Sequence, residues 1–129
     1  MLKLDIVTPE RHLLAIECKE ITLPGLHGEF GVLEGHISML AALKTGILSS
    51  KGDENLRLMV TNGFVEINSD CVRVLSEAAA IPSEVDEKFE RSLIKELREK
   101  LQKVEKSDIK EFNRLKVEIE RSLVKLQLL

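Results

Sequence analysis

The chain has 129 residues, of which 43% are hydrophobic and 32% are charged, and its formal net charge is −3. This length allows one modest core, or a small domain with an appendage, but not two full domains. The composition predicts a soluble folded protein, and no apolar run approaches the ~20 residues that span a bilayer. A net negative charge and only four aromatic residues, all Phe, argue against nucleic acid as a partner.

The N-terminal residues 1–7 alternate in hydropathy like a β-strand. They lack the apolar segment of a secretory signal and the Arg- and Ser-rich pattern of a transit peptide, so a cytosolic chain is expected. The two cysteines, Cys18 and Cys71, have neither metal-site spacing nor the density of a disulfide scaffold. We expect them to be reduced thiols in strands or in the core.

Up to Pro82, apolar residues recur with the period of two that is typical of strands. They are Leu2, Leu4 and Ile6; Ile21 and Leu23; Leu56, Leu58 and Val60; Val65 and Ile67; and Val72 and Val74. Turn residues separate these segments at positions 8–9, 24–25, 50–53, 62–63 and 68–70. The pattern predicts a small antiparallel β-sandwich or barrel.

Residues 23–40 are unusually rich in glycine, and the backbone there must turn repeatedly or approach another surface closely. The stretch contains Gly25, Gly28, Gly31 and Gly35, with Phe30, Val32 and Leu33 between them. It also contains Glu29 and His36, which a core does not readily bury. We therefore expect a contact surface here.

The last glycine or proline is Pro82, which predicts a boundary between a β domain at 1–82 and a helical segment at 83–129. The first part has a net charge of −4 (7 basic, 11 acidic residues) and the second of +1 (12 basic, 11 acidic). Ser83 is a candidate N-cap. Apolar residues then follow at helical spacing: Val85, Phe89, Leu93, Leu97, Leu101 and Val104, and, after a second start at Ser107–Asp108, Phe112, Leu115, Ile119, Leu123 and Leu126.

The short joint between the two helices predicts an antiparallel hairpin. Because 23 of its 47 residues are charged, the hairpin can bury one stripe on each helix but forms no core of its own. Basic residues form a stripe on each helix, roughly opposite the apolar row: Lys88, Arg91, Lys95 and Arg98 on the first, and Lys110, Arg114, Arg121 and Lys125 on the second. Each stripe is either a solvated face or a surface for an acidic partner, in which case docking depends on salt.

No catalytic constellation is visible. The three histidines lack metal-binding spacing, and there is no P-loop, dinucleotide fingerprint or Gly-x-Ser-x-Gly. Nothing orients Cys71 and His36 as nucleophile and base. Glu29 and His36 are too few ligands for a stable metal site, so they are interpreted as recognition residues, and no metal or cofactor is expected.

The combination of Leu-Pro-Gly at 23–25, Gly-Glu-Phe-Gly-Val-Leu at 28–33 and Gly-His at 35–36 resembles the signature of the epsilon subunit of F-type ATP synthases. The resemblance extends over the whole chain. It implies a ten-stranded sandwich that binds the gamma subunit of the central stalk and sits on the c-ring. It also implies a helical hairpin that lies folded or extends into the alpha/beta catalytic head, where it inhibits ATP hydrolysis.

The resemblance also assigns roles to single residues. Glu29 and His36 match the positions that face the polar loops of the ring, and the stalk-contact loop is Gly28, Phe30, Gly31 and Gly35. Two features depart from the family pattern. Glu34 replaces the usual proline before Gly-His, and the ATP-binding motif that opens the first helix in some relatives survives only at Asp86, because Phe89 replaces its arginine. Weak or absent ATP binding is expected.

The sequence therefore predicts a noncatalytic rotor subunit, peripheral to the cytoplasmic face of a bacterial plasma membrane through its complex. One alternative is a free-standing adaptor or chaperone-like module that grips a client with its hairpin. Another is a small hydrolase using Cys71 or His36. Co-purification with a large membrane ATPase distinguishes the first interpretation from the other two.

Overall fold

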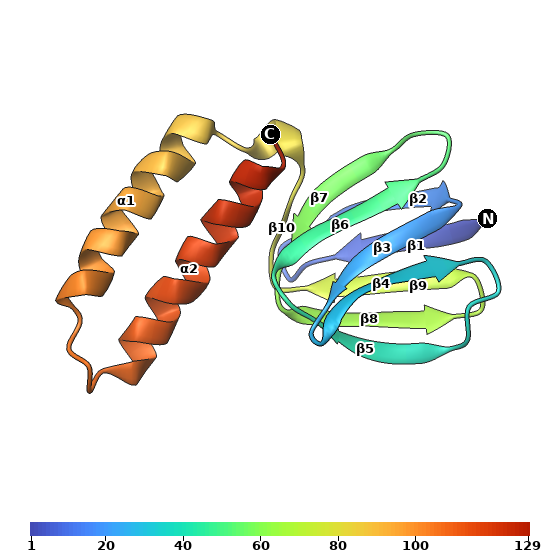
Figure 1. The fold of residues 1–129 in the computed structure, drawn as a ribbon. Helices are drawn as coiled ribbons and strands as arrows, with labels where there is room; N and C mark the ends of the chain where they lie inside the picture. Colours follow the sequence, from blue (N-terminus) through green and yellow to red (C-terminus); the bar gives the residue numbers. More distant parts are fainter.

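The computed structural model describes residues 1–129 as a β-sandwich with a two-helix hairpin beside it (Figure 1). The strands are β1 (Leu2–Val7), β2 (His12–Cys18), β3 (Glu20–Gly25), β4 (Gly28–Leu33), β5 (Met39–Leu43), β6 (Gly46–Lys51), β7 (Leu56–Val60), β8 (Gly63–Asn68), β9 (Cys71–Ser76) and β10 (Ala79–Ala80). A 3₁₀ turn, η1 (Pro82–Glu84), leads to α1 (Glu87–Lys103) and α2 (Ile109–Gln127). The predicted fold class is confirmed.

The strands pair in the order β10-β7-β6-β3-β5-β8-β9-β1-β2, with β4 also paired to β3. All pairs are antiparallel except β1 with β9. The two layers enclose a core to which most strands contribute fully buried Leu, Ile and Val side chains. Most residues of the predicted period-two segments lie in this core, and only Leu56 is partly exposed.

One predicted break is wrong. Pro24 and Gly25 do not form a turn but complete β3, and the reversal comes at residues 26–27 before β4. Gly25 is needed there because the hairpin is tight: a Cβ at Gly25 would lie 2.5 Å from the carbonyl oxygen of Gly28. The glycine in this pair therefore permits close strand packing rather than a turn.

The first helix begins later than predicted, and Ser83 is not its N-cap. Ser83 lies within η1, which is followed by the extended residue Val85. The cap is Asp86, whose carboxylate accepts a hydrogen bond from the Phe89 N–H at 3.1 Å. The predicted second start is confirmed, because Asp108 accepts from the Glu111 N–H at 3.2 Å.

The apolar faces of the helices differ in part from the predicted rows. On α1 the buried residues are Glu90, Ile94 and Leu97, whereas Phe89 is 60% exposed. Figure 1 shows α2 between α1 and the sandwich, and α1 therefore has extensive contact only with α2. Neither helix combines the length and the apolar composition that crossing a membrane requires.

Candidate functional site

The glycine-rich stretch forms β4 and the loop that follows it. Glu29 is exposed near the start of β4, and His36 is half-buried in the loop after its end, with its Nδ1 2.7 Å from the Ile37 carbonyl oxygen. Leu33, the last residue of β4, lies four positions after Glu29, a span of about 13 Å along an extended strand. The two predicted ring-contact residues therefore lie toward opposite ends of one exposed strand rather than in one cluster.

The other predicted contact residues surround this strand. Gly28 and Gly35 have φ values of +138° and +83°, in the region that favours glycine. Gly28, Gly31 and Gly35 are exposed, whereas Phe30 is half-buried against the sandwich core. The backbone of this stretch is therefore exposed at its glycines, and the Phe30 side chain packs against the core.

Contacts from distant segments hold the loop after β4. The Gly35 N–H donates to Asp70 Oδ1 at 3.1 Å, and the His36 N–H donates to the Leu33 carbonyl at 3.1 Å. Glu34 forms an exposed ion pair with the Met1 ammonium at 3.2 Å. The loop that lacks the family's proline is therefore fixed by contacts to the β8–β9 turn and the N-terminus.

An apolar stripe crosses the outer face of β5, β8, β9 and β1. Phe64 pairs with Ala42 on one side and Leu75 on the other, and Leu75 pairs with Val7. Phe64 is 54% exposed and Leu75 is 46% exposed. Sequence analysis missed this outer apolar stripe (Val7, Ala42, Phe64 and Leu75). Its signal was two large apolar residues at outward positions beside the buried Val65 and Val74.

A charged hollow of about 730 Å³ lies on the same outer face, over β8, β9, β1 and β2. Asp5 contacts His12, and Arg73 Nε lies 3.5 Å from Asp5 Oδ2. Cys71 is exposed in this hollow, whereas the His36 ring contacts the Ile37 carbonyl oxygen in the loop after β4. No group of three or more His, Cys, Asp or Glu side chains is arranged to hold a metal ion.

The hairpin docks on the sandwich through the C-terminal part of α2. Val124 and Leu128 pack with Met59 of β7 and Ala80 of β10, and all four are buried. The helices pack on each other through a different cluster, formed by Leu97, Leu115 and Ile119. We call these the docking cluster and the hairpin cluster.

Two basic residues of the second predicted stripe face the protein itself. Arg121 donates to Glu77 of the β9–β10 turn at 2.9 Å. Lys125 Nζ lies 3.5 Å from the Glu90 carboxylate on α1. The acidic partners were missed because their sequence separations are 44 and 35 residues, and no local spacing indicates such pairs. Lys110 and Arg114 are exposed, and Arg114 pairs with Glu111 and Glu118.

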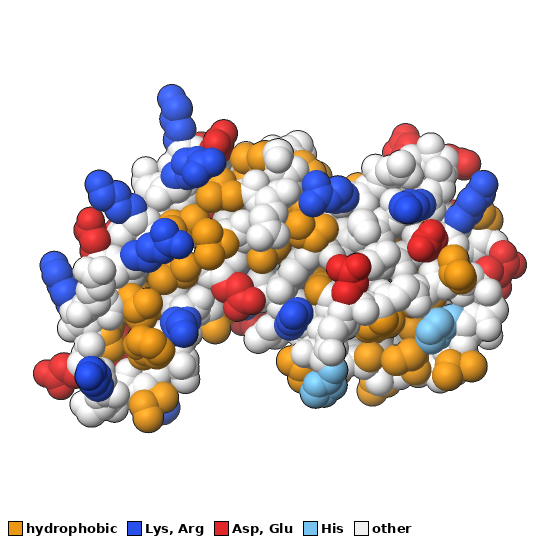
Figure 2. Space-filling model, in the orientation of Figure 1, with side chains coloured by type: hydrophobic (Ala, Val, Ile, Leu, Met, Phe, Trp, Pro, Cys, Tyr) orange, Lys and Arg blue, Asp and Glu red, His pale blue; other side chains and the backbone are white.

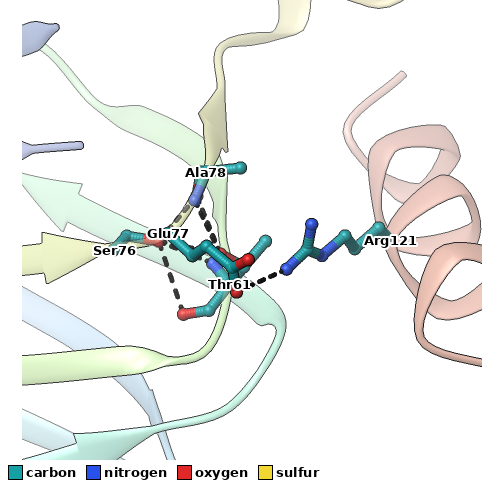
Figure 3. A network of polar contacts seen from close by, with 5 residues as sticks. All are labelled: Thr61, Ser76, Glu77, Ala78 and Arg121. Carbon is teal, nitrogen blue, oxygen red and sulfur yellow. Dashed lines mark hydrogen bonds and ion pairs between the residues drawn. The ribbon is translucent and has the colours of Figure 1, made fainter. Parts of the chain in front are cut away.

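A buried polar network fixes the turn that carries Glu77 (Figure 3). Ser76 Oγ accepts from the Thr61 N–H at 2.8 Å and donates to the Ala78 carbonyl at 2.6 Å. The Ala78 N–H in turn donates to Thr61 Oγ1 at 2.8 Å. Because each polar group has a partner, Glu77 projects toward Arg121 from a rigid base.

The first predicted basic stripe faces outward along α1. Figure 2 shows basic side chains on this helix beside an apolar furrow between the helices. The furrow has a volume of about 360 Å³ and is lined by Arg91, Lys95 and Arg98 together with Ile94, Leu123 and Leu126. Lys88, also in this stripe, is exposed. All four basic residues of this stripe are exposed, and Arg91 pairs with Glu87 at 3.0 Å.

Comparison with known proteins identifies the class. Residues 1–82 match the family described as ATP synthase, Delta/Epsilon chain, beta-sandwich domain. The ATP synthase epsilon chain of Geotalea daltonii is 39% identical over 127 residues, covering 98% of this chain and 91% of that relative. The epsilon chain of Geotalea uraniireducens is 37% identical with the same coverage. The chain belongs to the epsilon-chain family of ATP synthase subunits.

The fold also matches solved structures. A chain in the cryo-EM structure of the Euglena gracilis mitochondrial ATP synthase, described as OSCP/F1/c-ring, superposes with a TM-score of 0.82 and 22% identity. The match covers 98% of this chain and 79% of that one. At this identity the likeness concerns the fold, which includes the helical hairpin as well as the sandwich.

Proposed function

We propose that this subunit joins the gamma subunit to the c-ring in the central stalk of an ATP synthase, without a catalytic role of its own. Its hairpin restrains ATP hydrolysis in the alpha/beta head. In this role the subunit is peripheral to the cytoplasmic face of a bacterial plasma membrane, attached through the complex. The outer apolar stripe is the observation that carries the proposal, because a contiguous exposed apolar surface on a small protein is typical of a binding site.

The stripe fits a protein partner such as gamma. Phe64 and Leu75 supply apolar area at its centre, and the charged hollow with Asp5 and Arg73 lies beside it. This arrangement of an apolar centre and a polar rim is common at protein interfaces. Exposed β4, with Glu29 and His36 toward its ends, then offers hydrogen-bonding and ionic groups to the polar loops of the ring.

The gamma contact is tested by placing charge on the stripe. Phe64→Glu combined with Leu75→Glu is expected to weaken binding to purified gamma by about 30-fold or more, as at other apolar interface centres. Phe89→Glu is the matched control, since Phe89 is 60% exposed but lies on α1. Binding of the stripe variant with unchanged affinity, measured by calorimetry, would exclude this surface as the gamma contact.

The restraint of hydrolysis is tested by ending the chain after Pro82. The sandwich core shares no residue with the hairpin cluster, so the shortened protein retains its own core. Enzyme assembled with it is expected to hydrolyse ATP faster and to contain all its subunits in unchanged amounts. An unchanged rate would remove regulation from the proposed role.

A further inference from the structure

The furrow between α1 and α2 has an apolar floor that both helices supply. Ile94 of α1 is 6% exposed, Leu123 of α2 is 37% exposed, and Leu126 of α2 is half-buried. All residues that line the furrow belong to the two helices, so no strand covers it. Figure 2 shows this apolar surface beside the basic side chains of α1. The floor is therefore open to a ligand that brings apolar area of its own.

The rim of the furrow carries two cations that are free to bind an anion. The ion pairs of α1 do not include Lys95 or Arg98, and both side chains are exposed. They are three positions apart on the helix, so they are neighbours on its surface. The lining contains three basic residues and one acidic residue, Glu99, and its net charge is therefore +2. Lys95 and Arg98 together form a site for one negatively charged group.

The size of the furrow favours a single extended chain over a helix. Its lining on α1 extends from Arg91 to Gln102, which corresponds to about 16 Å at the rise of a helix. Half of the hydrocarbon core of a bilayer, which is roughly the length of one acyl chain, measures about 15 Å. The furrow volume is about 360 Å³. A helix of the same length and about 10 Å in diameter fills roughly 1,300 Å³, so the furrow cannot enclose one.

We propose that the furrow binds a single-chain amphiphile with an anionic headgroup, of which a long-chain carboxylate is the simplest example. The chain lies on the apolar floor, and the headgroup pairs with Lys95 and Arg98, whose guanidinium can hold a carboxylate at two points. This goes beyond the proposed function, because it assigns a ligand to the hairpin whether or not the subunit is assembled. The site is also separate from the ATP motif, since none of residues 85–90 lines the furrow.

Calorimetric titration of the full-length chain with dodecanoate at pH 8, below the concentration at which dodecanoate forms micelles, tests the proposal. Partial burial of one acyl chain leads us to expect a dissociation constant of about 0.1–1 mM. Dodecyltrimethylammonium has the same chain and the opposite charge, and it is expected to bind at least tenfold more weakly. Because the whole protein has a net charge of −3, unspecific attraction would favour this cation, and a preference for dodecanoate reports the local lining.

Variants separate the headgroup contact from the chain contact. Lys95→Gln combined with Arg98→Gln is expected to weaken dodecanoate binding about two- to thirtyfold, the range for two exposed ion pairs. Leu123→Ser is expected to weaken it about fourfold or more, which corresponds to the loss of one buried methylene. Lys88→Gln combined with Lys103→Gln is the matched control and leaves the affinity unchanged, because both lysines are exposed on α1 outside the furrow.

Equal affinity for dodecanoate and dodecyltrimethylammonium would overturn the proposal, because it would show adsorption without recognition of the headgroup. Equal affinities of the furrow variants and the control variant for dodecanoate would overturn it as well. The same titrations with an acidic amphipathic helical peptide and with vesicles of anionic phospholipid test two other occupants. Binding of either one that the furrow variants weaken, without binding of dodecanoate, would assign the furrow to that occupant instead. Self-association of the chain that these variants abolish would likewise assign it to a second copy.

Discussion

Arg11 and Glu84 form a two-point ion pair, although 73 residues separate them in the sequence. The Arg11 Nη2 donates to Glu84 Oε1 at 2.9 Å, and Nη1 lies 2.8 Å from Oε2. Arg11 also donates to the Ala79 carbonyl at 3.3 Å, and the Ile81 N–H donates to the same Glu84 carboxylate at 3.0 Å. The β1–β2 loop therefore fixes the segment from which α1 leaves the sandwich.

This pair predicts a pH dependence of stability. The hydrogen bond from Arg11, followed by that from the Ile81 N–H, lowers the pKa of Glu84. A carboxylate with a lowered folded-state pKa adds stability above its unfolded pKa of 4.5, and this stability is lost as pH falls through the lower folded value. Thermal unfolding of Glu84→Gln between pH 3 and 7 is therefore expected to show a smaller loss on acidification than the wild type.

Glu54→Gln is the control for this measurement, since Glu54 is an exposed carboxylate without an ion-pair partner. The midpoint temperature of thermal unfolding of Glu54→Gln is expected to change with pH in the same way as that of the wild type. The effect of Glu84→Gln is modest because the Glu84 side chain is 34% exposed and solvent screens the pair. Parallel curves for Glu84→Gln and wild type would contradict the assigned role of the pair.

Two glycines in strands are expected to respond differently to alanine. A Cβ at Gly63 would lie 1.9 Å from the carbonyl oxygen of Leu75, so the β8–β9 backbone must shift. The nearest atom to a Cβ at Gly31 is the Ile21 carbonyl oxygen at 3.9 Å. Gly63→Ala is expected to lower the free energy of unfolding by about 1–3 kcal/mol in urea titration, and Gly31→Ala to have little effect.

Gly31→Ala has a further use, because a variant that folds normally isolates the predicted contact role of this glycine. Weakened assembly with the stalk or ring would then reflect a close approach by the partner rather than damage to the sandwich. A large loss of stability in Gly31→Ala, or none in Gly63→Ala, would show that the strand packing described here is incorrect.

Met59 is expected to be the main apolar support of the docked hairpin. It is 1% exposed and packs against Val124 and Leu128 at the contact between β7 and α2. Met59→Ala is expected to reduce the free energy of unfolding by about 2–5 kcal/mol and to raise proteolysis within α2. Leu123→Ala is the control, since Leu123 is 37% exposed on the furrow side of α2, and equal effects of the two variants would contradict the assignment.

The sequence predicted the sandwich and the hairpin because their signals are local. Alternating apolar residues such as Val72 and Val74 mark strands, and Asp108 marks a helix start. The start of α1 was misassigned because Pro82 opens a separate 3₁₀ turn before Asp86. A single sequence gives no measure of how tightly such a turn is held by a residue as distant as Arg11.

Sequence reasoning singled out contact residues by their type, and their contact role stays a prediction, whereas it missed features that depend on tertiary pairing. Glu29 and His36 stand out in a glycine-rich stretch, and the structure leaves Glu29 exposed on β4 and His36 half-buried in the loop that follows. The outer apolar stripe depends on Phe64 and Leu75 becoming cross-strand neighbours, which requires the register of β8 and β9. The inward turn of Arg121 likewise depends on where α2 docks.

ATP binding is expected to be absent at micromolar concentrations. The Asp86 carboxylate already caps α1 through the Phe89 N–H, and the exposed Phe89 side chain offers no charge to a phosphate. Calorimetric titration of the isolated chain with ATP is expected to show no binding heat in this range. A micromolar dissociation constant would contradict the prediction, and Phe89→Lys provides a control for the effect of one added positive charge.

The two cysteines are expected to differ sharply in reactivity. Burial raises the pKa of the Cys18 thiol, because the thiolate loses solvation there, whereas Cys71 is exposed on β9. A thiol reagent at neutral pH is therefore expected to modify one cysteine per native chain and both after unfolding. Cys71→Ser should leave no fast-reacting thiol in the folded protein. Rapid modification of Cys18 in that variant would mean that β2 opens readily from the edge of the sheet, because the Cys18 side chain is fully enclosed while β2 stays paired with β1.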